Sequence, residues 1–413
     1  MLNSKQEREL AYVVLIDGIE PIPGYDRVEH AIVGGWRVIV QKGQFNVGDP
    51  AIYFEIDSRV PADKECFAFL EKRNYKIKTL KMCKTLSQGL LMHASDFGWH
   101  IYGSMKGEDS VVRQGIVEDD GTLHFVDDES RFLTNKLGVT YADEEDNARK
   151  APSVDKYKKM AQRHPNIFKQ PWARWFMQRD WGKKLMFFFF GKAKDKKNGW
   201  PAWVQKTDEE RIQNMPWILN DTGDWIATEK IDGTSTTFTM KRGKFGKLLF
   251  YVCSRNVCFD SVDKPCYYDS NVYWEMAKKY DMYKVLEILM SNYFPDAEWI
   301  TIQGETYGNG IQNRNYSIDG HDFAAFNLIT STHGRHGTCH MIKYLSNFGI
   351  PCVPVVDNCI NINRFANVDE ILKYAEGKSQ LDNLPREGIV FRSTDGVKSF
   401  KAVSNSFLLK YHG

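Results

Sequence analysis

The stretch that decides the fold is Thr228-Glu229-Lys230-Ile231-Asp232-Gly233, whose last five positions read E-K-x-D-G. An apolar run at 225–227 precedes it, and a run rich in threonine follows it at 234–239. Because β-branched and aromatic residues favour strands and glycine favours turns, the pattern predicts a strand, a glycine turn and a second strand. Lys230 is thereby predicted at a strand end beside a tight turn.

A lysine in this position has two interpretations. Its amine becomes a nucleophile only when it loses its proton, and burial and nearby positive charge would lower its pKa from about 10.4. The ordinary alternative is a solvated lysine at a hairpin turn, because so short a pattern also arises by chance in a chain with 31 glycines. The choice depends on the rest of the chain.

Composition excludes several classes of protein. The 413 residues suffice for two or three domains, and 42% hydrophobic content allows each of them a core. The sequence contains no uncharged apolar run of about 18 residues, so we expect no membrane span and no membrane partner. The first residues lack a signal-peptide pattern, and the eight cysteines show no C-x-x-C pair. We therefore expect a cytoplasmic protein with reduced thiols.

The net charge of +2 conceals two oppositely charged stretches. Residues 107–146 hold 12 acidic and 3 basic side chains, whereas residues 156–197 hold 13 basic and 2 acidic ones. The basic stretch also contains Trp172, Trp175, Phe176 and Trp181. Cations meet phosphates and aromatic rings stack on bases, so this composition favours contact with nucleic acid. The alternative is a solvated helical face with an aromatic core stripe.

Residues 1–145 carry short apolar runs separated by glycine turns, which is typical of a small β-barrel. Residues 76–82 alternate polar and apolar side chains, so we expect one half-exposed strand there. Its outer face would carry Lys76, Lys78 and Lys81, which suit phosphate backbones. The alternative is a structural β-domain that caps its neighbour. We expect the acidic residues 107–146 to form loops or a β-extension, and residues 146–200 to form a basic, partly helical linker.

Residues 201–413 hold the remaining predicted elements. Thr207 followed by Glu210 fits a capping box, so we expect a short helix to start at Thr207. Helical periodicity predicts one helix over 273–289 and others over 340–348 and 368–376. The charged residues predicted at strand ends are Lys230, Asp232, Arg255, Glu305, Glu387 and Lys401.

Each of these six charged residues, taken alone, would ordinarily lie on the surface. Their shared position at predicted strand ends indicates that together they line a pocket. Phosphoryl transfer needs a nucleophile, carboxylates that hold a divalent metal ion, and cations that neutralise phosphates. All three kinds of group are present in the set.

Segments between Lys230 and Asn405 resemble the motif series of covalent nucleotidyltransferases, the superfamily of ATP-dependent ligases and capping enzymes. In order they read E-K-I-D-G, S-R-N, I-Q-G-E-T-Y-G, F-A-A-F-N-L, R-E-G-I-V-F-R and S-F-K-A-V-S-N. The residues in these motifs are more similar to those of RNA ligases than to those of DNA ligases. N-terminal pieces such as F-N-V-G-D-P-A-I-Y-F-E-I-D-S resemble the OB domain of the Deinococcus-type and Naegleria-type RNA ligases. The resemblance does not extend over residues of roughly 100–200.

This resemblance implies an α+β chain. An OB-type β-barrel domain with an acidic extension would span 1–145, and a basic linker would span 146–200. A nucleotidyltransferase domain, similar to an ATP-grasp-like ligase domain of antiparallel sheets flanked by helices, would span 201–413. The implied activity is ATP-dependent ligation of RNA 5′-phosphate and 3′-hydroxyl ends by a monomer. The implied substrate is a nicked duplex or an RNA–DNA hybrid.

The resemblance also implies roles for the charged residues. Lys230 would attack the α-phosphate of ATP to give lysyl-AMP, and Lys401 would contact that phosphate. Asp232, Glu305 and Glu387 would hold Mg²⁺ or Mn²⁺. Nucleotide contacts would come from Glu229 at the adenine, from Phe323 or Phe326 stacked on it, and from Arg255 and Glu305 at the ribose or the 3′ end.

The last segment departs from the K-x-K pattern of some relatives, because Val403 stands where a second lysine would be. Lys398 or Lys410 could substitute for it. Two other functions stay open at this point. A capping guanylyltransferase has the same core and uses GTP, but its OB domain normally follows that core. A non-enzymatic RNA-binding protein would explain the basic stretch and the barrel, but not the charged strand ends.

Overall fold

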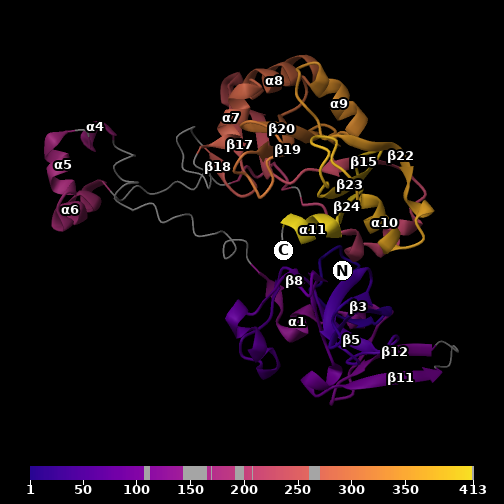
Figure 1. Cartoon of the computed structure of the whole chain (residues 1–413). Helices are drawn as coiled ribbons and strands as arrows, with labels where there is room; N and C mark the ends of the chain where they lie inside the picture. The colour runs from indigo at the N-terminus through magenta and orange to yellow at the C-terminus, as the bar shows by residue number, and fades with distance from the viewer. Residues whose placement is uncertain are drawn as a thin grey trace. The chain divides into compact units, whose positions relative to one another are not determined.

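The structure is a computed structural model, and it describes residues 1–106, 112–142, 165–168, 170–190, 200–206, 208–259 and 270–411. The chain divides into two compact units. One comprises Met1–Ala142 and Trp200–Gly413, and the other comprises Asp143–Gly199. The first unit begins with a β-rich OB-fold region and continues with a region of larger sheets flanked by helices (Figure 1).

Short strands build the OB-fold region, as the spacing of apolar runs predicts. They are β1 (Ala11–Leu15), β2 (Gly18–Pro21), β3 (Val28–Val33), β4 (Trp36–Gln41), β5 (Pro50–Phe54), β6 (Ser58–Arg59), β7 (Lys76–Ile77), β8 (Leu80–Met82), β9 (Thr85–Ser87) and β10 (Leu90–Met92). In the described residues these strands pair as β1-β5-β10, β2-β3-β4, β6-β7 and β8-β9. Gly34 and Gly35, both with positive φ, form the turn between β3 and β4.

A β-extension follows, as expected for the acidic stretch. Strands β11 (His100–Lys106) and β12 (Val112–Val117) form an antiparallel hairpin, and β13 (Leu123–Phe125) pairs with β12 (Figure 1). The short helix α1 (Thr134–Leu137) and strand β14 (Thr140–Tyr141) complete the region. Residues 107–111 and 143–146 of the predicted extension lie outside the described residues.

Two predictions for the OB-fold region are wrong. Residues 76–82 do not form one strand, because β7 pairs with β6 while β8 turns back on β9 through Cys83 and Lys84, both with positive φ. Alternation of side chains reports the face of a strand and not its partner, so the break was not visible in the sequence. The interpretation of this region as short strands and glycine turns also missed a nine-residue 3-10 helix, η1 (Glu65–Arg73).

The larger region contains two antiparallel sheets among its described residues. One has the order β22-β15-β23-β24 and the other the order β18-β17-β16-β19-β20-β21. Their strands are β15 (Asp224–Lys230), β16 (Thr234–Arg242), β17 (Leu248–Cys253), β18 (Cys258–Phe259), β19 (Trp299–Gly308), β20 (His321–Thr330), β21 (Gly334–Arg335), β22 (Val355–Asn361), β23 (Gly388–Ser393) and β24 (Ser399–Val403).

Helices cover both sheets. They are α7 (Val272–Lys279), α8 (Met282–Ile288), α9 (Thr338–Ser346), α10 (Val368–Ala375) and α11 (Asn405–Tyr411). The single helix predicted over 273–289 is therefore two helices. Asp281 separates them in a left-handed conformation, with φ of 45°, which an α-helix does not tolerate. The predicted helices at 340–348 and 368–376 are confirmed as α9 and α10.

The helix predicted to start at Thr207 is wrong. Thr207 itself lies outside the described residues, and the first helical turn of this stretch, η4 (Ile212–Asn214), begins only at Ile212. Residues 208–211 instead run beside β24, where the Lys401 backbone N–H donates to the Glu210 carbonyl at 2.7 Å. The Glu210 carboxylate that suggested a capping box instead accepts a hydrogen bond from Asn214 Nδ2 and lies 4.0 Å from Arg8 Nε.

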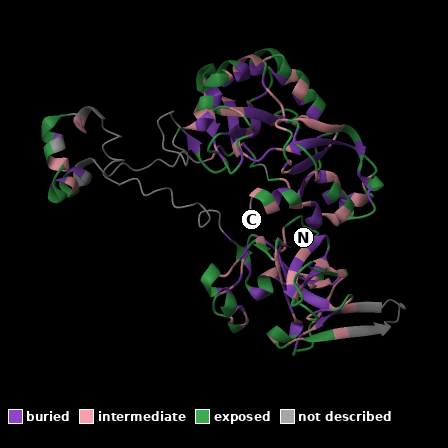
Figure 2. Cartoon of the chain, viewed as in Figure 1, coloured by how far each residue is buried: buried purple, intermediate pink, exposed green. Residues whose placement is uncertain are grey.

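Each sheet has its own hydrophobic core, as the buried strands in Figure 2 show. The six-stranded sheet packs on α7, α8 and α9 around Phe238, Met276 and Leu286. The four-stranded sheet packs on α10 around Trp225 and Phe391. Two separate cores leave a junction between the sheets where polar side chains can gather.

The second unit is helical where it is described. Helices α4 (Pro165–Phe168), α5 (Pro171–Met177) and α6 (Asp180–Phe190) account for the described residues of the predicted basic linker. Residues 146–164, 169 and 191–199 lie outside the described residues. The predicted α+β class, with an N-terminal OB fold, is confirmed. Within the described residues, the structure has no helix that is long and apolar enough to cross a membrane.

Candidate active site

Lys230 lies where the chain passes from one sheet to the other. It is the last residue of β15, which pairs with β22 and β23, while β16 pairs with β17 and β19. The two predicted strands are confirmed, with a bend at Gly233 between them in place of a tight turn, and the hairpin alternative is wrong because β15 and β16 do not pair with each other. Gly233 makes the crossing possible: a Cβ there would lie 2.4 Å from the Thr306 carbonyl oxygen.

A carboxylate from another strand holds the Lys230 amine. Its Nζ donates to Glu387 Oε1 at 2.7 Å, just before β23. Burial acts to lower the pKa of Lys230, but Glu387, Glu305 and Asp232 together raise it above its ordinary value. The expected lowering of this pKa is therefore not found in the protein without ligands, because three carboxylates surround the amine.

Glu305 lies on β19 opposite Ser235, among the same charges. The pKa of its carboxyl is raised to about 8, mainly by burial. The neighbouring Glu387 and Asp232 raise it further, whereas Lys230 and Arg255 act to lower it. One ammonium thus faces three carboxyl groups. Within the described residues, no three acidic, histidine or cysteine side chains already converge as metal ligands. The excess of carboxylate oxygen nonetheless suits a hard divalent ion, which keeps several waters and needs few protein ligands.

Two cations share one carboxylate beside this cluster. Lys401 Nζ lies 2.9 Å from Asp208 Oδ1, and Arg255 Nη2 lies 2.8 Å from Asp208 Oδ2. Burial lowers the pKa of Lys401. The nearby cations Arg211 and Lys230 lower this pKa further, whereas Asp208 acts to raise it. The structure therefore brings the predicted Lys401 and Arg255 together through Asp208, a residue that we had placed in a helix.

Arg211 is a second functional candidate that sequence reasoning missed. Burial lowers the pKa of its guanidinium, which interacts electrostatically with Asp57 and Glu387 and lies 5.8 Å from the Trp36 ring centroid. Residue 211 also forms a parallel bridge with Lys401 of β24. The run K-T-D-E-E-R is rich in charge, but a cluster of charges alone does not show that an upstream segment returns to the site.

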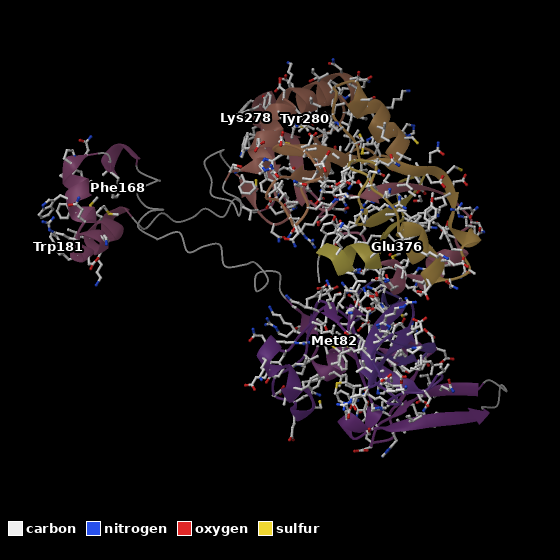
Figure 3. All side chains as sticks on the ribbon, in the orientation of Figure 1. Met82, Phe168, Trp181, Lys278, Tyr280 and Glu376 are labelled. Atoms are coloured by element: carbon white, nitrogen blue, oxygen red, sulfur yellow. The ribbon has the colours of Figure 1, made fainter. Side chains whose placement is uncertain are left out.

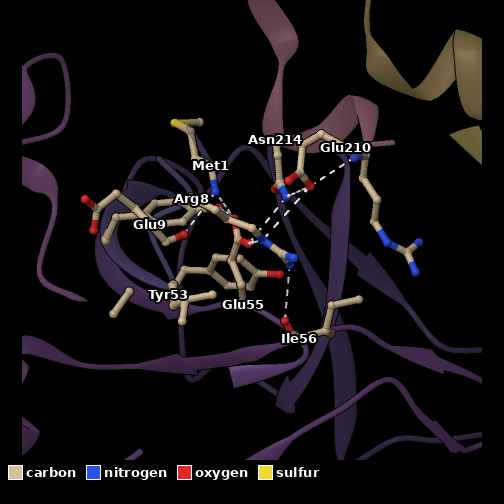
Figure 4. A network of polar contacts seen from close by, with 12 residues as sticks. Met1, Arg8, Glu9, Tyr53, Glu55, Ile56, Glu210 and Asn214 are labelled. Atoms are coloured by element: carbon tan, nitrogen blue, oxygen red, sulfur yellow. Dashed lines mark hydrogen bonds and ion pairs between the residues drawn. The ribbon is translucent and has the colours of Figure 1, made fainter. Parts of the chain in front are cut away.

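The same segment is fixed to the OB-fold region by a polar network. Glu55 accepts hydrogen bonds from Arg8 Nε at 2.6 Å, from Tyr12 at 3.0 Å and from Asn214 Nδ2 at 3.4 Å (Figure 4). Asn214 also donates to Glu210 at 2.8 Å. Charge-assisted hydrogen bonds of this kind are about twice as strong as neutral ones, so they hold residues 210–214 in place.

Glu229, beside the lysine, points a carboxylate into the interior. Its Oε2 accepts from the Gln380 backbone N–H at 2.8 Å, whereas its Oε1 is buried and has no hydrogen-bond partner among the described residues. Burial raises the pKa of this carboxyl. An unsatisfied buried acceptor costs free energy, and a ligand N–H group would satisfy it.

The two predicted stacking residues differ in exposure. Phe323 is 0% exposed and packs against Phe238 in the core of the six-stranded sheet, so its ring faces are covered by other side chains. Phe326 is only partly buried and lies in a cluster with Ile231, next to Lys230. Of the two, only Phe326 can offer a ring face to a ligand.

Neither suggested substitute for the missing lysine is among the main charges that act on Lys230 or Lys401. Lys398 forms an ion pair with Asp221 at the opposite end of β24, and the Lys410 ammonium lies 5.1 Å from the Tyr411 ring centroid. Val403 is buried against Leu86. A cation that does lie beside Lys401 is Arg211.

A groove crosses the OB-fold region between β3, β4 and η1. It has a volume of ≈ 1010 Å³, and its cationic lining residues are Lys72, Arg73, Lys76 and Lys78. Phe69 and Met82, 62% and 39% exposed, also line it (Figure 3 labels Met82). Of the three predicted nucleic-acid contacts, Lys76 and Lys78 thus share the groove. Lys81 does not line it and donates to the Leu409 carbonyl at 2.7 Å.

Comparison with known proteins agrees with this geometry. Residues 223–412 match the family described as RNA ligase. Residues 10–94 match a family described as an OB-fold domain. The comparison with curated proteins found no match. The predicted resemblance to RNA ligases with an N-terminal OB domain is confirmed.

Solved structures of the Naegleria gruberi RNA ligase are similar over the whole chain. A mutant form without ligand is 23% identical, with a TM-score of 0.64, and the match covers 98% of each chain. A mutant form with ATP and Mn is 24% identical, with a TM-score of 0.64, and the match covers 98% of this chain and 100% of that one. A form with PPi is 24% identical with a TM-score of 0.63, and the match covers 98% and 99%. At this level of identity the likeness is one of fold.

Proposed function

We propose that this protein is an ATP-dependent RNA ligase that joins a 5′-phosphate to a 3′-hydroxyl through a lysyl-AMP intermediate on Lys230. The observation that carries the proposal is the position of the Lys230 amine. It lies at the junction of two sheets, among three carboxyl groups, with Lys401 and Arg211 beside it. A nucleophile, carboxylates and cations are the parts that phosphoryl transfer requires.

In the first step, Lys230 Nζ attacks the α-phosphorus of ATP. A nitrogen–phosphorus bond forms, the amine loses a proton, the bond from the α-phosphorus to the bridging oxygen breaks, and pyrophosphate leaves. Lys401 and Arg211 would stabilise the negative charge on the phosphates. Both are partly or fully enclosed, where a fixed cation acts more strongly than in water.

Asp232, Glu305 and Glu387 would hold Mg²⁺ or Mn²⁺. A divalent cation at these carboxylates would offset their charge and so favour the neutral, nucleophilic form of the Lys230 amine. The Naegleria gruberi ligase structures with ATP and Mn support this choice of nucleotide and metal.

In the second step, the 5′-phosphate oxygen of the RNA attacks the AMP phosphorus, and Lys230 leaves with its electron pair and takes up a proton. In the third step, the 3′-hydroxyl attacks the activated 5′-phosphate, a phosphodiester forms, and AMP leaves. Arg255 and Glu305 would position the ribose or the 3′ end. Both lie within electrostatic reach of Lys230 or its neighbours.

Base recognition would come from the residues beside Lys230. Glu229 Oε1 offers the acceptor that an adenine amino group needs, and Phe326 offers a ring face. Aromatic stacking on a base contributes about 1–3 kcal/mol. The N-terminal region, 1–145, would hold the nicked duplex or hybrid through the OB-fold groove, because A-form duplexes are recognised mainly through shape and phosphates.

The test is incubation with nucleotide labelled in the α-phosphate, followed by nicked RNA. We expect ATP, and not GTP, to label the full-length protein, and nicked RNA to release the label while the strand becomes sealed. Lys230→Ala should abolish labelling, whereas Lys278→Ala, which changes an exposed lysine on α7, should label normally.

Preferential labelling by GTP would favour the capping guanylyltransferase instead. RNA binding without labelling by either nucleotide would favour the non-enzymatic alternative. Labelling by ATP without sealing of any RNA substrate would contradict the ligase assignment while leaving the adenylyltransferase chemistry in place.

A further inference from the structure

Three exposed tryptophans lie close together in the helical second unit. Trp172 and Trp175 on α5 and Trp181 on α6 are 51%, 46% and 55% exposed (Figure 3 labels Trp181). Tryptophan is usually buried for most of its surface, so three such rings within ten positions form an unusual apolar patch. Exposed patches of this kind mark interaction sites.

The rings are presented by packed helices. Ala173 of α5 and Met186 of α6 are 0% and 4% exposed and form the small core of the unit. The helices approach closely at Gly182, where a Cβ would lie 2.2 Å from the Phe176 carbonyl oxygen. Phe176 lies beneath the exposed rings, with centroid distances of 5.1 Å to Trp175 and 5.4 Å to Trp181.

Cations surround the patch. The Arg179 guanidinium carbon lies 3.7 Å from the Trp175 ring centroid, and Lys184 is exposed on α6. Lys183 pairs with the fully solvated Asp180 at 3.0 Å. In sequence, residues 156–197 carry 13 basic and 2 acidic side chains. Aromatic rings stack on unpaired bases and cations meet the phosphates between them, so the composition fits a single strand of nucleic acid.

We propose that Trp172, Trp175 and Trp181, with Arg179 and Lys184, form an accessory site for single-stranded RNA outside the ligase site. Unpaired bases stack on the indole rings while the two cations contact phosphates. Asp180 argues against a membrane surface. It lies between Arg179 and Trp181 with a side-chain exposure of 93%, and insertion of the rings into a bilayer would bring this carboxylate to the acyl boundary. Stacking on RNA leaves it in water.

The site is tested with the full-length protein in chelator and without ATP, so that no ligation step takes part. Fluorescence anisotropy measures binding of a labelled RNA single strand of about 15 nucleotides. We expect the double variant Trp172→Ala and Trp181→Ala to weaken this affinity about tenfold or more. The affinity for a blunt RNA duplex should change much less, because its bases are already stacked.

The matched control is Trp217→Ala, which removes a 41% exposed tryptophan from η5 (Pro216–Asn220) in the other unit. It should bind the single strand like the unchanged protein. Lys184→Glu leaves every ring in place and should lower the salt dependence of single-strand binding by at least about one unit of log–log slope. Circular dichroism and ATP labelling of Lys230 should be unchanged in all variants, which separates this site from the ligase chemistry.

An unchanged single-strand affinity in both the tryptophan and the lysine variants would overturn the proposal. So would an equal loss of single-strand and duplex binding, since that indicates charge without stacking. Loss of sedimentation with anionic phosphatidylglycerol vesicles, with RNA binding retained, would assign the patch to a membrane surface instead. A lowered melting temperature of the whole protein with unchanged RNA binding would show that the rings pack on the chain itself.

Discussion

The active-site junction and the OB-fold groove both gather lysines and arginines, but in different electrostatic settings. At the junction, Lys230 and Lys401 are partly buried, and their Nζ atoms lie 2.7 and 2.9 Å from the carboxylates of Glu387 and Asp208. In the groove, Lys72 and Arg73 are exposed at the end of η1 on an open surface. Enclosed charges shift one another's pKa values, which chemistry needs, whereas exposed cations hold a polyanion and are screened by salt.

This difference between the two regions predicts that removal of divalent metal has the largest effect on labelling of the protein by ATP. With a chelator present, labelling of the protein by ATP should fall below detection, because Glu387, Glu305 and Asp232 then keep the Lys230 amine protonated. RNA affinity measured in the same buffer should be unchanged. Full labelling in the chelator would remove the carboxylate cluster from the mechanism.

The next effect is a change in pH dependence. Because Glu387 raises the pKa of Lys230, its removal in Glu387→Gln should lower that pKa and move the rising limb of the labelling rate to lower pH. The maximal rate should fall by about 10²-fold, since a charged group at the reacting centre is lost. The rate is measured by quenched labelling with ATP across a pH series.

The control for this shift is Glu376→Gln. Glu376 receives hydrogen bonds from Ser404 and Ser406 and is not among the main charges that act on Lys230. The labelling rate of this variant should rise with pH around the same midpoint as that of the unchanged protein. A profile for Glu387→Gln that moves to higher pH, or stays in place, would contradict the assigned cause of the raised pKa.

A smaller effect should separate the two phenylalanines. Phe326→Ala should raise KM for ATP about tenfold with little change in stability, because stacking on a base contributes about 1–3 kcal/mol. Phe323→Ala removes a fully buried ring and should instead lower the free energy of unfolding by about 3–5 kcal/mol. Steady-state labelling and urea denaturation measure the two quantities. The reverse pattern would place adenine on the other ring.

The smallest effect should appear in the groove. Lys78→Ala should weaken binding of nicked RNA severalfold and reduce the salt slope by about one, as expected for one lost phosphate contact. Lys81→Ala, whose lysine is held by the Leu409 carbonyl, should bind RNA nearly as before. Both variants should label with ATP normally. An equal loss of RNA affinity in the Lys78→Ala and Lys81→Ala variants would indicate that Lys81 also contacts the nucleic acid.

Local sequence patterns predicted the strand that ends at Lys230, the strand after it and the helices α9 and α10. They did not show that β15 and β16 belong to different sheets, because alternation in one strand says nothing about its partners. The predicted helix at Thr207 failed for a related reason. Glu210 lies 4.0 Å from Arg8 Nε, and the neighbouring Asp208 and Glu209 form ion pairs with Lys401 and Arg392. These long-range contacts outweigh a local cap.

The same limit explains the residues that were missed. Arg211 and Asp208 reach the site only because residues 208–211 lie beside β24, nearly two hundred positions further along the chain. Lys398 was a suggested substitute for the missing lysine, but it precedes β24 and pairs with Asp221. Composition identified the charged groups, and only the sheet topology decided which of them meet.

The central claim is that Lys230 carries the nucleotide, and peptide mapping tests it most directly. The full-length protein is incubated with ATP and Mg²⁺ without RNA, digested under conditions that preserve phosphoramidates, and examined by mass spectrometry. The account predicts AMP on the peptide that contains Lys230 and on no other lysine. AMP on a different lysine, or a protein that stays unmodified, would contradict it.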